Sequence, residues 1–183
     1  ESLQLFQTEQ NYFGISFALD GLSTTLARMG DLDGAWETAL QLKATSIQLG
    51  NTTHLAVTAE MFGQICEKRG DMSAAFSEYL EGLRYGVINT NATNIVPHLF
   101  HLGRLIATDN LAPKTWGVTL LTLVQNHPYS QAGWFAFRQK ECEVLLNILQ
   151  GKLSRDDYLA AVVSGKQVDL IEGSKRFLAV IDA

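Results

Sequence analysis

Residues 30–36 read GDLDGAW, and residues 70–76 read GDMSAAF. The second stretch repeats the first after forty positions, and each places a glycine and an aspartate before an apolar run. Glycine readily adopts the left-handed conformation that ends a helix. Aspartate accepts hydrogen bonds from the free N–H groups that begin the next helix. Each stretch therefore predicts a turn between two helices, and the repetition predicts a series of helix pairs.

The residues before each turn carry the same apolar stripe. Apolar or small side chains recur at i, i+3, i+4 and i+7, which is the spacing of one helix face. The stripe occurs three times, as Leu19, Leu22, Ser23 and Leu26, as Ala59, Phe62, Gly63 and Cys66, and as Leu99, Leu102, Gly103 and Ile106. The small residue in the third place predicts a close helix crossing, with Ala35 and Ala75 on the partner helices.

The pattern divides the chain into repeat units and a tail. Helix-pair units are expected at about 13–50, 53–90 and 95–127, and a helical cap at 128–183. The third turn departs from the others, because Asp109-Asn110 stands in place of Gly-Asp and Pro113 is expected in the first turn of the next helix. The opening ESLQLF carries apolar side chains without a preceding cap. It is expected to be the end of an earlier repeat helix, in a piece of a longer protein.

The small residue, the Gly-Asp turn and the following alanine resemble the tetratricopeptide repeat, although the period is about forty rather than about 34 residues. Longer units of this kind are similar to the arrays of large bacterial regulators, among them LuxR-type, MalT-like and AfsR-like proteins and some adenylate cyclases. The tail, with a segment from Tyr158 to Gly165 and a final helix expected near Asp169, resembles the helical tail of those arrays. The resemblance implies an all-α fold, a right-handed superhelix of stacked antiparallel helix pairs with a C-terminal cap.

Composition excludes several classes of partner. The formal net charge is −5 and no Lys/Arg-rich run occurs, whereas duplex binding needs clustered cations. No apolar run approaches the roughly 18 residues that span a bilayer, and no signal peptide is visible. Cys66 and Cys142 fit helix interiors and are expected to be buried thiols. We expect a cytoplasmic chain that binds neither nucleic acid nor membrane directly.

Motifs of catalysis are missing from the sequence. It contains no G-x-x-x-x-G-K-[ST] loop and no G-x-S-x-G elbow, so we expect neither enzymatic activity nor a cofactor. His98 and His101 lie three residues apart on a predicted helix, but no acidic or cysteine ligand shares their turn, and zinc takes three or four protein ligands. We expect no metal and predict that both histidines pack between helices. His54 and His127 are expected in loops.

The first helix of each pair is expected to line a concave groove along the superhelix. The stripe fixes which residues face the groove: Phe17, Asp20, Thr24 and Arg28 in the first unit, Val57, Glu60, Gln64 and Lys68 in the second, and Pro97, Phe100, Arg104 and Thr108 in the third. Asp20 with Glu60 would form an acidic strip, and Arg28 with Lys68 and Arg104 a basic strip. The alternative is that both strips are ordinary solvated surface.

Two functions of different classes fit these features. The first is a non-enzymatic interaction module of a bacterial signalling or transcription regulator, which binds a protein, a peptide or the parent's own upstream domains on its groove. An acidic ligand would then bridge the basic strip. The second is a small-molecule effector-sensing domain of the same kind of regulator. A shallow, charged, open groove favours the first function, and a groove floor rich in aromatic side chains with a deep pocket favours the second.

Overall fold

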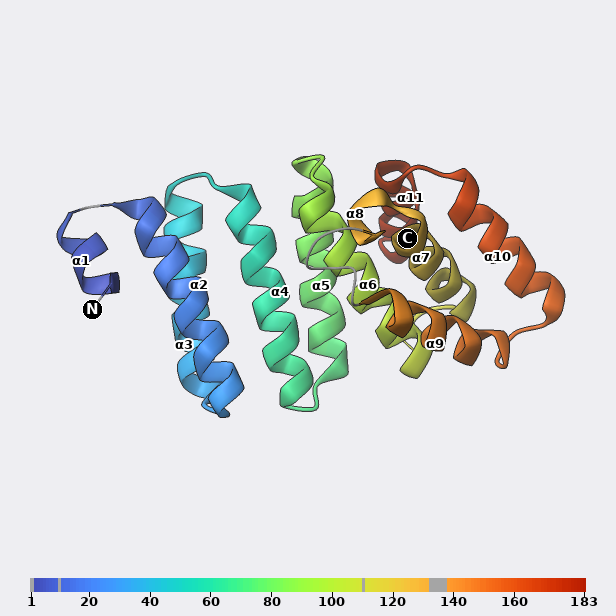
Figure 1. Cartoon of the computed structure of the whole chain (residues 1–183), viewed down its shortest axis with the longest axis horizontal. Helices are drawn as coiled ribbons and strands as arrows, with labels where there is room; N and C mark the ends of the chain where they lie inside the picture. Colours follow the sequence, from blue (N-terminus) through green and yellow to red (C-terminus); the bar gives the residue numbers. More distant parts are fainter. Residues whose placement is uncertain (1, 10, 110, 132–137) are drawn as a thin grey trace. The chain divides into compact units, whose positions relative to one another are not determined.

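The computed structural model describes residues 2–9, 11–109, 111–131 and 138–183. Within these residues the chain is all-helical and contains no strand (Figure 1). The helices are α1 (Ser2–Thr8), α2 (Tyr12–Met29), α3 (Leu32–Gln48), α4 (Thr52–Lys68), α5 (Met72–Ile88), α6 (Ala92–Thr108), α7 (Lys114–Asn126), α8 (Pro128–Gln131), α9 (Gln139–Gln150), α10 (Arg155–Gln167) and α11 (Leu170–Ile181). The predicted all-α chain of neighbouring helix pairs is confirmed for this part of the sequence.

The helices form two compact units, Glu1–Tyr85 and Gly86–Ala183. The division falls within α5, near the end of the second predicted repeat. The predicted division at 127/128 and the handedness of the superhelix stay predictions.

The turns of the first unit follow the chemistry that the sequence predicts. Gly30 and Gly70 adopt positive φ angles of 89° and 81°. The carboxylate of Asp31 accepts the N–H of Gly34 at 2.9 Å, and that of Asp71 accepts the N–H of Ala74 at 2.9 Å. Left-handed glycines end α2 and α4, and aspartates begin α3 and α5.

The predicted small residues lie where the paired helices cross. The hydroxyl of Ser23 donates a buried hydrogen bond of 2.8 Å to the carbonyl oxygen of Ala35. A Cβ on Gly63 would overlap the ring of Tyr79, which is fully buried on α5. Ala75, like Ala35, has no exposed surface. Small side chains at these positions therefore set the close approach of α2 to α3 and of α4 to α5.

The core of the first unit joins one repeat to the next. One buried cluster within it consists of Leu19, Ala39, Leu42, Met61 and Phe62. Trp36 of α3 packs against Phe62 of α4, with ring centroids 4.4 Å apart. At the end of α4, the Arg69 guanidinium pairs with Asp33 at 2.5 Å and lies 5.1 Å from the Trp36 ring. The α3–α4 packing therefore combines an apolar centre with a charged contact at one end.

In the second unit, the end of α6 is capped by lysines rather than by Gly-Asp. The Lys114 ammonium donates hydrogen bonds of 2.5 Å to the carbonyl oxygens of Ile106 and Asp109. The Lys152 ammonium donates to the carbonyl oxygen of Ala107 at 2.7 Å. Cations at a helix C-terminus satisfy its open carbonyls and its dipole. Pro113 precedes α7 as its N-cap residue, so its predicted place in the first turn is wrong, and Asn110 lies outside the described residues.

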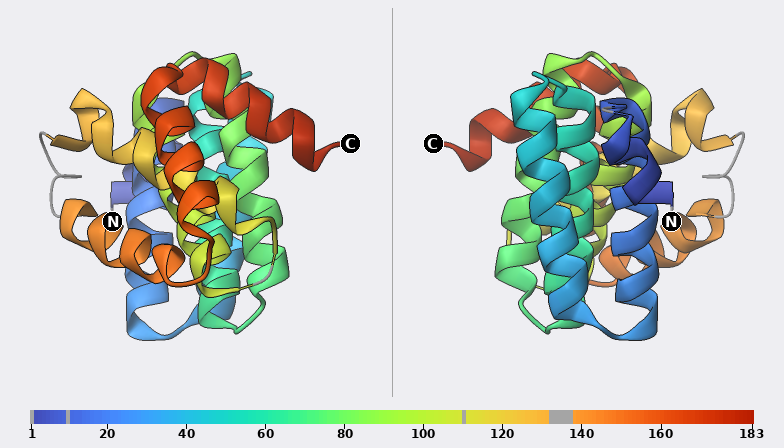
Figure 2. Two further views of the ribbon diagram at one scale, coloured as in Figure 1. Left: turned by 90° about the vertical axis from the view of Figure 1, so that its right-hand side faces the viewer. Right: turned by 90° about the vertical axis from the view of Figure 1, so that its left-hand side faces the viewer.

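The C-terminal helices cover α6 and α7. α10 lies along α7, α9 contacts both α6 and α7, and α11 contacts both as well, as the left view of Figure 2 shows for α10. Ser154 caps α10, and Asp169 caps α11 by accepting the N–H groups of Ile171 and Glu172. The predicted start of the last helix near Asp169 is confirmed.

Both cysteines are free and buried, as expected. Cys66 lies inside α4 and Cys142 inside α9, and burial raises the pKa of each thiol, that of Cys142 to about 12. Within the described ranges, every helix is too short or too polar to cross a membrane.

Candidate functional site

The predicted groove residues of the first two repeats, which all lie in the compact unit Glu1–Tyr85, share one surface, which we call the α2–α4 face. It consists of Phe17, Asp20, Thr24 and Arg28 on α2 and Glu60, Gln64 and Lys68 on α4. Five of these side chains are exposed, while Asp20 and Glu60 are half-buried, as is the neighbouring Val57. The two helices contact each other and run in the same direction (Figure 1). Equivalent positions of two repeats therefore lie side by side.

Asp20 and Glu60 bring two carboxylates together on this face. Burial raises the pKa of Asp20, the negative charge of Glu60 raises it further, and the nearby His54 opposes the shift. Gln64 donates a hydrogen bond of 3.1 Å to the Glu60 carboxylate. Because desolvation and like charge both disfavour ionised Asp20, a cation placed between the carboxylates would be stabilised.

Aromatic rings border the acidic pair. Phe17 meets the His54 imidazole edge-on with centroids 6.1 Å apart, and Phe13 lies 4.7 Å from Phe17. Both phenylalanines expose more than half of their surface. The predicted loop position of His54 is wrong, because Asn51 caps α4 and places His54 in its first turn. Burial lowers the pKa of His54, so the imidazole adds little positive charge near neutral pH.

The other end of the α2–α4 face is basic. Arg28 and Lys68 lie exposed in the last turns of α2 and α4. Each follows its acidic counterpart, Asp20 or Glu60, by eight residues. At about 1.5 Å per residue, the acidic and basic ends are about 12 Å apart along the helices. The face is therefore dipolar.

The third predicted set of groove residues is largely covered. Phe100 has no exposed surface and Pro97 is buried, so their predicted exposure in a groove is wrong. The Arg138 guanidinium lies over the Phe100 ring at 4.9 Å, because the α9 region packs on α6. Arg104 is half-buried with its guanidinium 3.4 Å from His101, and Thr108 is exposed.

Histidines 98 and 101 belong to the interior of the second unit. Both are buried on α6, and His98 donates a hydrogen bond from Nδ1 to the carbonyl oxygen of Asn94 at 2.5 Å. Their predicted packing between helices is consistent with this burial. In the described part of the chain, no group of three or more His, Cys, Asp or Glu side chains is arranged to hold a metal ion.

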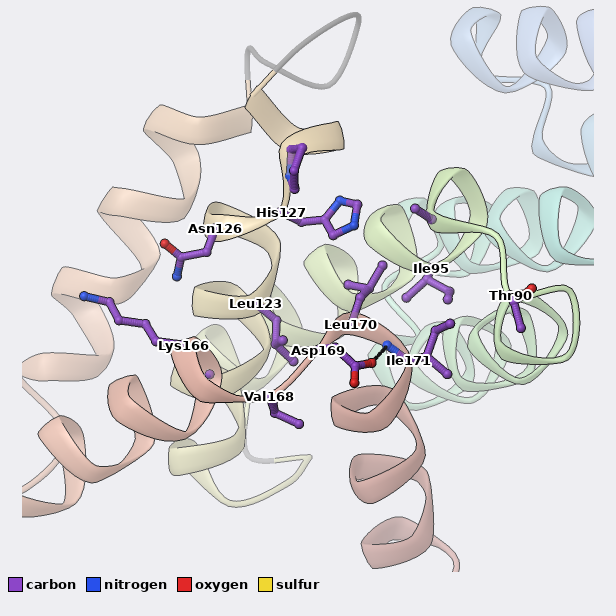
Figure 3. Close-up of a pocket in the computed structure, with 13 residues that line it drawn as sticks. Thr90, Ile95, Leu123, Asn126, His127, Lys166, Val168, Asp169, Leu170 and Ile171 are labelled. Atoms are coloured by element: carbon purple, nitrogen blue, oxygen red, sulfur yellow. Dashed lines mark hydrogen bonds between the residues drawn. The ribbon is translucent and has the colours of Figure 1, made fainter.

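A pocket of about 430 Å³ lies within the second unit, lined by residues of α6, α7, α8, α10 and α11 and of the α5–α6, α7–α8 and α10–α11 connections. Figure 3 shows Ile95, Leu123 and Leu170 at its centre, with Asn126 and Lys166 on one side and Thr90 on the other. The centre of the pocket is thus apolar and its edge carries polar groups. The residues that line the pocket come from separate places between Thr90 and Ile171, and no local sequence motif marks them.

His127 supplies a defined hydrogen-bond donor at the pocket. It follows α7 as the C-cap residue, and its Nδ1 accepts the N–H of Tyr129 at 3.2 Å. Burial lowers the pKa of His127, so the imidazole is neutral at pH 7. Because Nδ1 is an acceptor, the proton of the neutral ring resides on Nε2.

No protein-family model matches the chain, and no curated protein or solved structure matches it either. The resemblance to tetratricopeptide-like regulators accordingly rests on the repeated residues alone.

Proposed function

We propose that this chain is a non-enzymatic helical-repeat interaction module, of the kind found in bacterial signalling or transcription regulators. Its binding surface is the α2–α4 face, and its partner is a protein segment or peptide, or a segment of the same polypeptide. The observation that carries this proposal is the pairing of Asp20 with Glu60 beside exposed aromatic rings.

The acidic pair selects a cation. Each carboxylate is half-buried, and the raised pKa of Asp20 reflects the cost of holding charge there. A lysine, an arginine or an N-terminal ammonium would neutralise both carboxylates at once. The ring of Phe17 would pack against the apolar stem of such a side chain.

The basic end selects an anion at a fixed spacing. Arg28 and Lys68 lie about 12 Å from the acidic pair along the helix axes. An extended peptide covers about 3.3–3.6 Å per residue, so a cation and a carboxylate four residues apart would reach both ends. The charges therefore determine the direction of the peptide as well as its composition. The sequence predicts a different ligand, an acidic segment that bridges the basic residues of three repeats. We propose the peptide with both charges instead, because the groove residues of the third repeat are largely covered.

The test is fluorescence anisotropy with labelled twelve-residue peptides. One peptide carries lysine and glutamate four residues apart, and a second of the same composition carries them side by side. We expect the first to bind at least about five-fold more tightly, and binding to weaken with salt because exposed charges are screened. Equal affinities, or no binding of either peptide, would contradict the proposal.

Variants locate the site. Asp20→Asn with Glu60→Gln removes the acidic end, and Arg28→Glu with Lys68→Glu reverses the basic end. Each pair should weaken binding of the spaced peptide about five-fold or more. Lys140→Glu with Lys175→Glu makes the same charge change as the basic-end variant, on exposed residues of α9 and α11, and is the matched control for it. A loss in the control as large as in the test variants would assign the binding to net charge.

A second function, small-molecule effector sensing, is favoured by the pocket of the second unit. Its apolar centre and the Nε2–H of His127 suit a small ligand with an apolar body and one acceptor group, such as a carbonyl or carboxylate. Screening a set of medium-chain carboxylic acids by thermal shift tests this function. Stabilisation that is lost in Leu123→Trp, which fills the pocket, would support it, and no shift with any acid would contradict it.

A further inference from the structure

The end of α1 repeats the end of α3. The N–H of Asn11 donates to the carbonyl oxygen of Phe6 at 2.9 Å, and forty residues later the N–H of Asn51 donates to that of Ser46 at 2.8 Å. The Asn11 side chain caps α2 through Gly14, as Asn51 caps α4 through His54. α1 therefore occupies, against α2, the place that the last two turns of α3 occupy against α4.

α1 covers only the beginning of α2. The Phe6 ring fills the space in which a Cβ of Gly14 would lie, and Leu3 packs on the core cluster of the unit. Further along α2, Gly21 has no neighbouring atom within 4 Å of its Cβ position. In Figures 1 and 2, α1 lies near the end at which α2 begins.

α4 is the repeat counterpart of α2, and its residues that correspond to the uncovered side of α2 are buried. Leu22 is 42% exposed, whereas Phe62, forty residues later, is 2% exposed. The same holds along this side, where exposed Gly21 and Thr25 correspond to buried Met61 and Ile65. We call Gly21, Leu22, Thr25 and Met29 the open side of α2. A leucine and a methionine exposed together on one helix side indicate a surface that lacks its packing partner.

The preceding helix is what buries Phe62. Trp36, Ala39 and Leu42 lie along α3 at intervals of three residues and contact or cluster with the Phe62 side chain. Arg69, the counterpart of Met29, also reaches back to α3 through Asp33 and Trp36. A helix with an aromatic, a small and a leucine side chain at this spacing thus fits the first helix of a repeat.

We propose that the open side of α2 binds one amphipathic helix of the α3 type, whose axis continues directly into α1. The continuity follows from α1, which already occupies the place of the last two turns of such a helix. Its aromatic side chain would lie over Leu22, as Trp36 lies over Phe62. This surface is distinct from the α2–α4 face, so the inference stands or falls independently of the proposed function.

The test joins a copy of residues 31–41, DLDGAWETALQ, to the full chain immediately before Ser2. The forty-residue offset aligns Ser2 with Leu42, so the copy continues α1 in the register of α3. A matched extension has its copies of Trp36 and Ala39 changed to aspartate. We expect the first extension to raise Tm by about 4 °C or more relative to the second. Equal Tm values for the two extensions would overturn the proposal.

Leu22→Thr locates the contact. It changes an exposed side chain in the original chain, so Tm should move little there, whereas in the extended chain it should remove most of the gain. An equal effect in both backgrounds would show that the added helix packs elsewhere. Light scattering of the unextended chain tests the other occupant, since a dimer abolished by Leu22→Thr would assign the open side to a second copy and overturn the proposal.

Discussion

The hydroxyl of Ser23 donates a 2.8 Å hydrogen bond to the carbonyl oxygen of Ala35, twelve residues later and across the first helix pair. Ser23 is buried, and Ala35 has no exposed surface. The bond joins the two helices within their buried contact, where a larger side chain would separate them. The small residue of the first repeat thus supplies a polar link as well as space.

Ser23→Ala should lower the free energy of unfolding by about 1 kcal/mol, because one buried hydrogen bond is lost while the volume hardly changes. Chemical denaturation measures the difference. Ser77→Ala removes an exposed hydroxyl that bonds within its own helix, to the carbonyl oxygen of Ser73, and should change stability by less than about 0.5 kcal/mol. Equal effects of the two substitutions would contradict a helix-joining role for Ser23.

Gly63→Ala should destabilise the chain by about 1–3 kcal/mol through overpacking. The added methyl would overlap the Tyr79 ring, which cannot easily move away, because its hydroxyl donates a 2.5 Å hydrogen bond to Glu67. The larger Gly63→Leu should cost more. Gly21→Ala is the matched control, since it adds a methyl to open space on α2 and should stabilise by about 0.5–1 kcal/mol. A neutral Gly63→Ala would place the helix crossing elsewhere.

The helix pairs and part of the site could be predicted from sequence because they depend on local, repeated chemistry. Gly30 and Gly70 end helices, and the aspartates after them begin the next ones, within a span of five residues. The pairing of Asp20 with Glu60 follows from the same repeat, since residues forty apart occupy equivalent positions on neighbouring helices.

The remaining features depend on contacts between distant residues. Phe100 is covered by Arg138, and the end of α6 is capped by Lys152, more than forty residues later. Neither contact lies within one helix turn, and neither joins equivalent positions of two repeats. The pocket is assembled in the same way, from positions such as Ile95 and Leu170. A repeat pattern gives the order of the helices but not the way in which the last three fold back over α6 and α7.

Asp20→Asn should raise stability at neutral pH. Burial and the charge of Glu60 raise the pKa of Asp20 in the folded chain above its ordinary value of 3.8. The folded state therefore favours the protonated acid, and stability is lost as pH rises from about 3.8 through the folded-state pKa. The amide removes this loss, so the Tm of the variant should exceed that of the original chain at pH 7, and the difference should vanish below about pH 3.8.

The control for this effect is Glu37→Gln, which neutralises an exposed carboxylate of α3. Because Glu37 is exposed, its replacement should change the Tm at pH 7 by less than Asp20→Asn does. A Tm gain for Asp20→Asn that persists undiminished at pH 3 would show that packing, not charge, is responsible.

His127 should titrate below its ordinary pKa of 6.5, because burial disfavours the imidazolium. The unfolded chain then binds a proton at a higher pH than the folded chain does. The contribution of this group is fully present above about pH 6.5 and is lost as pH falls through that value toward the lower folded-state pKa. NMR titration should give a His127 pKa below 6.5, with the neutral ring protonated on Nε2, since Nδ1 accepts the Tyr129 N–H.

His127→Asn keeps an acceptor for that N–H and removes the titrating ring. Its Tm should fall less between pH 7.5 and 5.5 than that of the original chain. The control is His54→Asn, which leaves the His127 imidazole in place. Its Tm should still show the fall between pH 7.5 and 5.5 that His127 causes. A His127 pKa of 6.5 or above, or an Nδ1-protonated ring, would remove the neutral Nε2 donor on which binding of an acceptor group in the pocket depends.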